Sequence, residues 1–411
     1  MRNLYSIKSR NFCLIAAASC VFSASFSFAQ TQSNDPMLRA MQAELGREKT
    51  LLVLPGMQRP YFIEYRLDDL DTYEAVANYG ALTREEANHQ RVARVTVRVG
   101  DYAVDSSTSR GDGAVALAPS ENNPEALRYA LWLATDTAYK NALRAYSAKQ
   151  AALKQFQTPQ MEHDFAEAKP VVHVAPLVKM DLDRNEWKRR IIEASGLFAT
   201  APEVRASAEQ VQYSTANIRA AAVNHYLVNT EGTVLRQGYT GYSAMIGVGG
   251  QAPDGMRLGR DNGTTAADAK DLETWPVFRK RVIDDLKSLE ALRAAPVVAG
   301  DDYHGPVLFS GDAASDVMLR LLVPNVEADR PAMGTTARTT GAYASSYKSR
   351  VLPAMLNVTD NPLMATFDGK ALLGAYAVDD EGVPAQSVNV VVNGVLEVRV
   401  RPWHVVMARG D

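Results

Sequence analysis

Cysteine is nearly absent from this sequence, and its absence excludes several kinds of site. The two cysteines among the 411 residues, Cys13 and Cys20, both lie near the N-terminus. A chain that loses this segment on export has no disulfide, no thiol nucleophile and no thiolate ligand for a metal. A mature chain without cysteine is common among exported bacterial proteins, whose oxidising compartment would attack stray thiols.

An excess of charge of one sign is also lacking. The sequence has 44 Lys and Arg residues against 47 Asp and Glu residues, a formal net charge of -3, and no long run of either sign. Nucleic acid and an anionic membrane surface are therefore not expected as partners, because both are bound mainly by clustered positive charge.

The N-terminal segment has the composition of a secretory signal peptide. Basic residues, and no acidic residue, precede the apolar stretch Phe12–Ala29. This stretch is short for a membrane helix, which needs about 20 strongly apolar residues, and it ends with small residues where signal peptidase cleaves, Ser27 and Ala29. We expect residues 1–29 to be removed, leaving a periplasmic or secreted protein with no membrane span. A lipoprotein signal with Cys20 as the modified residue is the alternative.

The hydrophobic pattern predicts an α+β fold. Helices are predicted over Pro36–Leu51, Ser120–Gln157, Asp183–Gly196, Ala201–Tyr213 and Thr265–Ala295, and strands over Tyr61–Leu67, Arg91–Val99, Ala220–Thr230 and Val234–Ile246. Gly247–Gly263 is expected to be a surface loop, and the acidic residues Asp68, Asp69 and Asp71 a solvated helix start. Apolar runs at Val307–Phe309, Ala371–Val378 and Val388–Val400 predict further strands, with a hairpin turn at Asn393-Gly394.

A chain of this length exceeds what one hydrophobic core usually supports, so several domains are expected. We place an N-terminal α+β domain of α/β type, with a long helix, at residues 35–165. A middle α+β segment follows at 171–295, and a β-rich C-terminal domain at 296–411. The expected linker between the first two is Ala166–Pro170.

Several segments, in order along the chain, resemble one protein family. They are Tyr61–Tyr65, Val97–Tyr102, Asn229–Thr233, Ser349–Pro353, Ala377–Gln386 and Asn393–Leu396. Together these segments are similar to the TldD/PmbA family of metallopeptidases and their non-catalytic partner subunits. That family continues well beyond the position of Leu396. The resemblance therefore implies either a truncated C-terminal domain or a genuine short form.

The resemblance also implies where a zinc site would lie. Active members carry His-Glu-x-x-x-His on a helix, which places two imidazoles and a carboxylate around the metal, and they draw a further ligand from a late cysteine. The matched positions here are Leu319, Arg320 and Pro324. None of these side chains can bind zinc or activate its water.

The six histidines do not supply a substitute. No two of them lie three or four residues apart, so no helical ligand pair can form: His89, His163, His173, His225, His304 and His404. The nearest clusters are His163 with Asp164 and His173, and His304 with Asp301 and Asp302, for which solvent-facing or capping roles are favoured. We therefore predict no catalytic, cofactor-binding or metal-ligating residue and no cofactor, although active relatives use zinc.

Two functions follow from these observations. The first is a non-catalytic member of the family that binds peptides or acts as a partner subunit in peptide processing. Its expected partners are a peptide substrate and a histidine-bearing paralogue in a heterodimer. The alternative is an active metallopeptidase with an unrecognised metal site. The sequence leaves open whether the chain is an enzyme.

Overall fold

The structure, a computed structural model, describes residues 34–107, 113–156, 163–297, 304–326, 343 and 346–397. The described residues from Asp35 onward belong to one unit by their contacts. Within the described residues, no helix is both long and apolar enough to cross a membrane.

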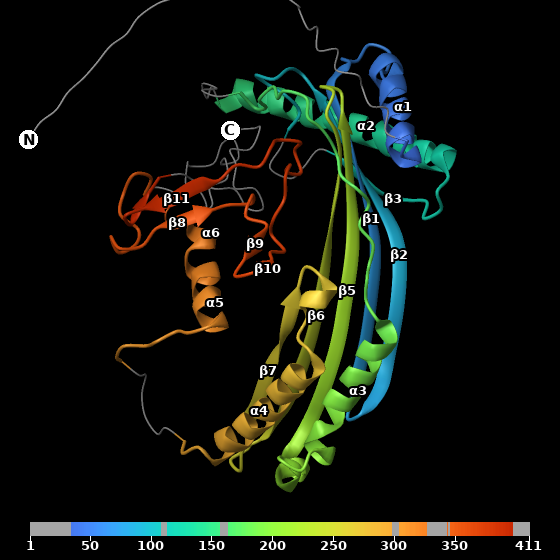
Figure 1. The fold of residues 1–411 in the computed structure, drawn as a ribbon. Coiled ribbons are helices and arrows are strands. Elements are labelled where there is room, and N and C mark those ends of the chain that lie inside the picture. The colour runs from blue at the N-terminus through green and yellow to red at the C-terminus, as the bar shows by residue number, and fades with distance from the viewer. Residues whose placement is uncertain are drawn as a thin grey trace, which may run out of the picture. The chain divides into compact units, whose positions relative to one another are not determined.

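A seven-stranded sheet organises most of the chain (Figure 1). Its strands are β1 (Pro60–Asn78), β2 (Ala81–Val99), β3 (Ala114–Ala118), β4 (Val172–Val174), β5 (Val211–Asn229), β6 (Val234–Gln251) and β7 (Arg257–Ala266). The order is β3-β2-β1-β5-β6-β4, and β7 pairs with another part of β6. All neighbours are antiparallel except β4 and β6.

This sheet includes strands from both sides of the expected linker at 166–170. Strand β1 pairs with β5 along its length, from Glu64 opposite Asn229 to Asn78 opposite Thr215. The ranges expected for the N-terminal domain and for the middle segment therefore contribute to one continuous sheet.

Helices cover one face of the sheet in two groups. Helices α1 (Pro36–Leu51) and α2 (Pro124–Phe156) pack near one end, where Tyr65, Leu67 and Leu131 are buried together. Helices α3 (Arg184–Thr200) and α4 (Trp275–Ala294) pack near the other end, around Tyr73 and Phe278. Figure 1 shows the two groups at opposite ends of the long strands. Odd-numbered β1 residues face the helices, so even-numbered residues line the other face.

Local sequence explains several element boundaries. Asp35 caps α1, because its Oδ1 accepts hydrogen bonds from the backbone N–H groups of Met37 at 2.8 Å and Leu38 at 3.2 Å. The hairpin between β1 and β2 turns at Tyr79 and Gly80, whose φ angles are 52° and 84°. Two residues of positive φ match the right-handed twist of the flanking strands.

Two predictions for the middle of the chain are wrong. The helix expected over Ala201–Tyr213 is only a short 3-10 helix, η1 (Arg205–Gln210), because β5 begins at Val211 and pairs with β1 and β6. The loop expected over Gly247–Gly263 is the β6–β7 hairpin. Its glycines serve close packing: a Cβ at Gly259 would lie 2.7 Å from the hydroxyl oxygen of Tyr213.

The C-terminal part contains short elements. They are α5 (Asp312–Leu321), α6 (Val323–Val326), β8 (Val358–Asp360), β9 (Thr366–Phe367), β10 (Lys370–Ala371), β11 (Val388–Val392) and β12 (Val395–Leu396). The predicted turn at Asn393-Gly394 is confirmed, with φ angles of 47° and 77° between β11 and β12. The strand predicted at Val307–Phe309 is absent, and that at Ala371–Val378 is reduced to the end of β10 and an isolated bridge. Residues 398–400 of the third predicted run lie outside the described residues.

Candidate functional site

The positions that the family resemblance assigns to zinc lie on a helix, but they carry unsuitable side chains. Leu319 and Arg320 lie in the last turn of α5, and Pro324 lies in α6. Leu319 is 59% exposed, and the side chain of Arg320 lies 4.0 Å from the carboxylate of Asp316 on the same helix. The residues present do not fit a zinc ion, since none of the three offers a nitrogen, oxygen or thiolate ligand that zinc binds in proteins.

The histidine clusters considered from the sequence do not form a metal centre in the described part of the chain. There, no group of three or more His, Asp or Glu side chains is arranged to hold a metal ion. The Asp164 carboxylate instead accepts hydrogen bonds from Lys149 Nζ at 2.5 Å and from the backbone N–H of Asp105 at 2.9 Å. Asp301, Asp302 and His404 lie outside the described residues.

Two histidines pair with aspartates in the middle of the long sheet. The Asp68 carboxylate lies 2.7 Å from Nδ1 of His225, and the Asp69 carboxylate lies 2.6 Å from Nε2 of His89. The prediction of a helix start at these acids is wrong. They belong to β1, because cross-strand histidine and arginine side chains offset the poor strand propensity of aspartate.

Asp68 is held as a carboxylate by its neighbours. Burial alone would raise its pKa, but His225 and Arg94 together hold the pKa of Asp68 below its ordinary value. Nε2 of His225 is buried and has no hydrogen-bond partner among the described residues. The His225 ring is therefore held at Nδ1 by Asp68, whereas its Nε2 has no hydrogen-bond partner among the described residues.

A groove of about 490 Å³ lies on the sheet face opposite the helices. Its floor follows two neighbouring rows of cross-strand residues. One row consists of Asn88, Thr72, Ala221 and Gly241, and the next of Glu86, Glu74, Arg219, Ser243 and Thr265. Ala221 and Gly241 leave room because their side chains are small or absent. The groove therefore crosses the strands.

Charges in the groove are paired. The Glu74 carboxylate accepts hydrogen bonds from Nε of Arg219 at 2.7 Å and from Nη2 of Arg84 at 2.5 Å. Arg219 is nevertheless 65% exposed at its side chain, so its guanidinium group is accessible to a ligand. Leu373, from the C-terminal part, adds an apolar wall near Gly241.

The C-terminal segment that carries the family resemblance contacts this same sheet. The side-chain amide of Gln237 on β6 donates a hydrogen bond to the carbonyl of Val378 at 2.5 Å, and Val378 packs with Leu227 and Leu235. Residues Asp379–Gly382 form a turn, in which Oδ1 of Asp379 accepts hydrogen bonds from the backbone N–H groups of Glu381 and Val383. The resemblance segment thus attaches the C-terminal part to the sheet.

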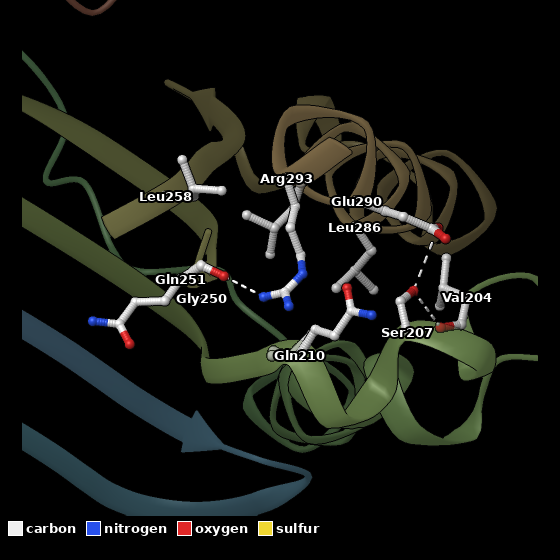
Figure 2. Close-up of a pocket in the computed structure, with 11 residues that line it drawn as sticks. Val204, Ser207, Gln210, Gly250, Gln251, Leu258, Leu286, Glu290 and Arg293 are labelled. Carbon is white, nitrogen blue, oxygen red and sulfur yellow. Dashed lines mark hydrogen bonds between the residues drawn. The ribbon is translucent and has the colours of Figure 1, made fainter. Parts of the chain in front are cut away.

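A second pocket, at the end of the sheet near α4, is too small for an organic ligand (Figure 2). Its free volume of about 20 Å³ corresponds to roughly one water molecule. Arg293 from α4 closes it by a hydrogen bond to the Gln251 carbonyl, and Ser207 bonds to Glu290 at 3.3 Å.

The sequence pattern did not reveal the groove. Its floor residues come from five strands, and their proximity depends on the register between strands far apart in the chain. A partial signal was present in β1, where Glu64, Arg66, Asp68 and Glu74 occupy even positions and so mark a polar face.

Comparison with known proteins gives a match to one family model and matches to several solved structures. Residues 302–400 match the family model described as the PmbA/TldA metallopeptidase C-terminal domain. A search of curated proteins found no match.

Solved structures share the fold over most of the chain. A Thermotoga maritima protein, described as a candidate modulator of a DNA gyrase, has a TM-score of 0.57 and 16% identity, covering 90% of this chain and 73% of that one. TldE from Thermococcus kodakarensis has a TM-score of 0.55 and 13% identity, covering 88% and 70%. A Bacteroides thetaiotaomicron protein, also a candidate modulator of DNA gyrase, has a TM-score of 0.54 and 10% identity, covering 89% and 70%.

Identities this low show a shared fold alone, whereas the match over residues 302–400 is specific to one family. The match includes the helix with the altered zinc positions and the segment that contacts the sheet. The C-terminal match and the common fold together support membership of this chain in the TldD/PmbA family.

Proposed function

We propose that this protein is a non-catalytic subunit of the family that binds extended peptides during peptide processing. The observation that carries the proposal is the groove across the sheet, whose volume of about 490 Å³ lies within the range of ligand sites. The altered positions Leu319, Arg320 and Pro324 support a role without zinc chemistry.

The dimensions of the groove favour an extended ligand. It crosses five strands, which lie about 4.8 Å apart, so its floor is about 19 Å long. An extended chain covers that distance with about six residues. The floor offers hydroxyl, amide and charged groups on both sides of the small residues Ala221 and Gly241. Such a lining suits the main-chain polar groups of a peptide more than an apolar ligand.

We further propose that cleavage, where it occurs, belongs to a histidine-bearing paralogue that forms a heterodimer with this chain. The N-terminal signal segment would place this chain in the periplasm or outside the cell, so its substrates there would be exported peptides. This arrangement requires no metal ligand from the chain itself.

Binding is tested with fluorescein-labelled octapeptides of mixed sequence and the purified protein. Ala221→Phe should fill the groove and weaken binding at least tenfold, because Ala221 faces the groove and is only partly exposed. The matched control is Ala87→Phe, an exposed site on the other face of the sheet, opposite Tyr73. Equal affinity of both variants and the unaltered protein would refute the groove as the peptide site.

Catalysis is tested by elemental analysis and peptide cleavage, with the chain alone and co-expressed with a histidine-bearing paralogue. Less than about a tenth of an equivalent of zinc is expected in the lone chain, because the family positions lack ligands. Zinc and cleavage only in the mixture would support the subunit role. Stoichiometric zinc and cleavage in the lone chain would establish the alternative, an active metallopeptidase.

A further inference from the structure

The outer edge of the sheet differs sharply between its two parts. Residues 81–90 of β2 pair only with β1, so their outer side is an edge, and they include the charged residues Arg84, Glu85 and Glu86. Charged side chains are a usual means of keeping a sheet edge from pairing with another chain. The rest of this edge is β3, with the uncharged sequence Ala-Val-Ala-Leu-Ala. Figure 1 shows β3 beside β2 at the border of the sheet.

The phase of the hydrogen bonds identifies which β3 groups point outward. The Val99 carbonyl accepts a bond from the Ser106 backbone N–H at 2.9 Å, and its own N–H bonds to Ser106 Oγ at 3.1 Å. Both Val99 groups thus point away from β1, as do those of the other odd-numbered β2 residues. Three of these odd-numbered residues, Arg91, Ala93 and Val95, pair with the β3 residues Ala118, Ala116 and Ala114. The N–H and C=O groups of Val115 and Leu117 therefore point away from the sheet.

These four outward groups have no hydrogen-bond partner among the residues that the structure describes. The side chains of the same two residues are also exposed, Val115 by 70% and Leu117 by 76%. Neither a charge, a proline nor a bulge within β3 blocks the approach of another strand. An apolar edge of this kind pairs readily with a strand of another chain.

We infer that β3 is a self-association edge, at which a second copy of this chain extends the sheet across a two-fold axis through Ala116. Antiparallel pairing about this axis places Val115 opposite Leu117 of the second copy, and Leu117 opposite its Val115. In each of the two Val115–Leu117 pairs, the two residues exchange two hydrogen bonds. The dimer therefore gains four hydrogen bonds, and all four outward groups of each copy take part in them. The exposed side chains become apolar cross-strand pairs on one face.

A second copy is favoured over an unrelated strand by this self-complementarity. The spacing of the two outward residues around Ala116 is symmetric, and no charge on β3 selects a partner of opposite charge. This inference is independent of the proposed peptide groove, which is lined by residues 72–74, 86, 88, 219–221, 241–243, 265 and 373 and includes no β3 residue.

The test is sedimentation equilibrium of the purified full chain over about 1 to 100 μM, a range suited to a weak strand-mediated dimer. The unaltered protein should show twice the mass of the chain at the upper concentrations. The double variant Val115→Lys with Leu117→Lys should associate at least tenfold more weakly, because each lysine would face a lysine of the second copy. Leu82→Lys is the matched control, since it adds a lysine to the charged part of the edge, and it should dimerise normally.

A second variant separates edge pairing from side-chain effects. Leu117→Pro removes one outward donor but no β2–β3 hydrogen bond, and it should also weaken association at least tenfold. Circular dichroism and the urea midpoint check that each variant is folded. Protection of the Val115 and Leu117 amides from hydrogen exchange should rise with protein concentration. A monomeric unaltered protein at 100 μM, or a double variant that dimerises like Leu82→Lys, would overturn the inference.

Discussion

Asp105 is the residue whose removal should test the packing of this fold most directly. Its side chain is fully buried and accepts hydrogen bonds from Tyr61 Oη at 2.8 Å, Arg98 Nη1 at 2.9 Å and the Ser107 backbone N–H at 2.7 Å. Lys149 lies 4.0 Å from the same carboxylate. Asp105→Asn keeps the shape but removes the negative charge that balances these cations.

The expected cost is about 3–5 kcal/mol, the loss found when one partner of a buried ion pair is removed and the other stays buried. The assay is urea unfolding at pH 7, with the slope against urea expected to stay unchanged. The control is Asp136→Asn on α2, whose pair with Lys140 is 44–51% exposed and should contribute no more than about 0.5 kcal/mol.

The effect of Asp105→Asn on the free energy of unfolding should also depend on pH. Burial would raise the pKa of Asp105, but Arg98 and the hydrogen bonds from Ser107 and Tyr61 hold that pKa below its ordinary value. The stabilisation by the carboxylate is therefore present above the unfolded pKa of about 3.9. It is lost as the pH falls through the lower folded pKa. The difference between the two proteins should shrink below about pH 4. A difference under about 0.5 kcal/mol at pH 7, smaller than a typical exposed ion pair, would refute the reasoning.

Three further substitutions test other parts of the fold. Phe278→Ala should cost about 3–5 kcal/mol in urea unfolding, because Phe278 is fully buried between α4 and the sheet. Tyr65→Phe should lower the free energy of unfolding by about 1 kcal/mol, because it removes one buried hydrogen bond, between the Tyr65 and Thr135 hydroxyl groups at 2.9 Å. An unchanged free energy of unfolding would show that this hydroxyl pair adds nothing to stability. Gly394→Ala should speed proteolysis at residues 346–397 without lowering the urea midpoint of the sheet. The new methyl group would lie 2.8 Å from the Pro353 carbonyl oxygen, and the backbone at this position has a positive φ that alanine adopts poorly.

The sequence predicted elements whose causes are local. Helix α1 was predicted from Pro36 to Leu51, and the structure gives the same bounds, because Asp35, Pro36 and the apolar spacing all act within one segment. The turn at Asn393-Gly394 was likewise predictable, since these residues adopt positive φ readily. The α+β fold class followed from the same local patterns.

Features that depend on pairing could not be predicted in this way. Strand β1 continues through Asp68 and Asp71 to Asn78 because β2 and β5 supply partners on both sides, among them His225 and Arg94. The groove also needs Ala221 and Gly241 in one cross-strand row. No single segment contains that information. The register between the strands, rather than the strand propensity of each residue, decides which residues line the groove.

The pairing of β1 with β5 affects how the chain reaches its fold. Glu64 and Asn229 are neighbours in the sheet, yet the chain between them includes α2, α3 and several strands. Because closing so long a loop costs entropy before the contacts repay it, this step should be slow and late. Until β5 arrives, the β1–β2 hairpin exposes an unpaired edge and an apolar face bearing Tyr65, Leu67 and Tyr73. A chain synthesised N-terminus first would therefore expose this edge and this apolar face to aggregation until β5 has been made.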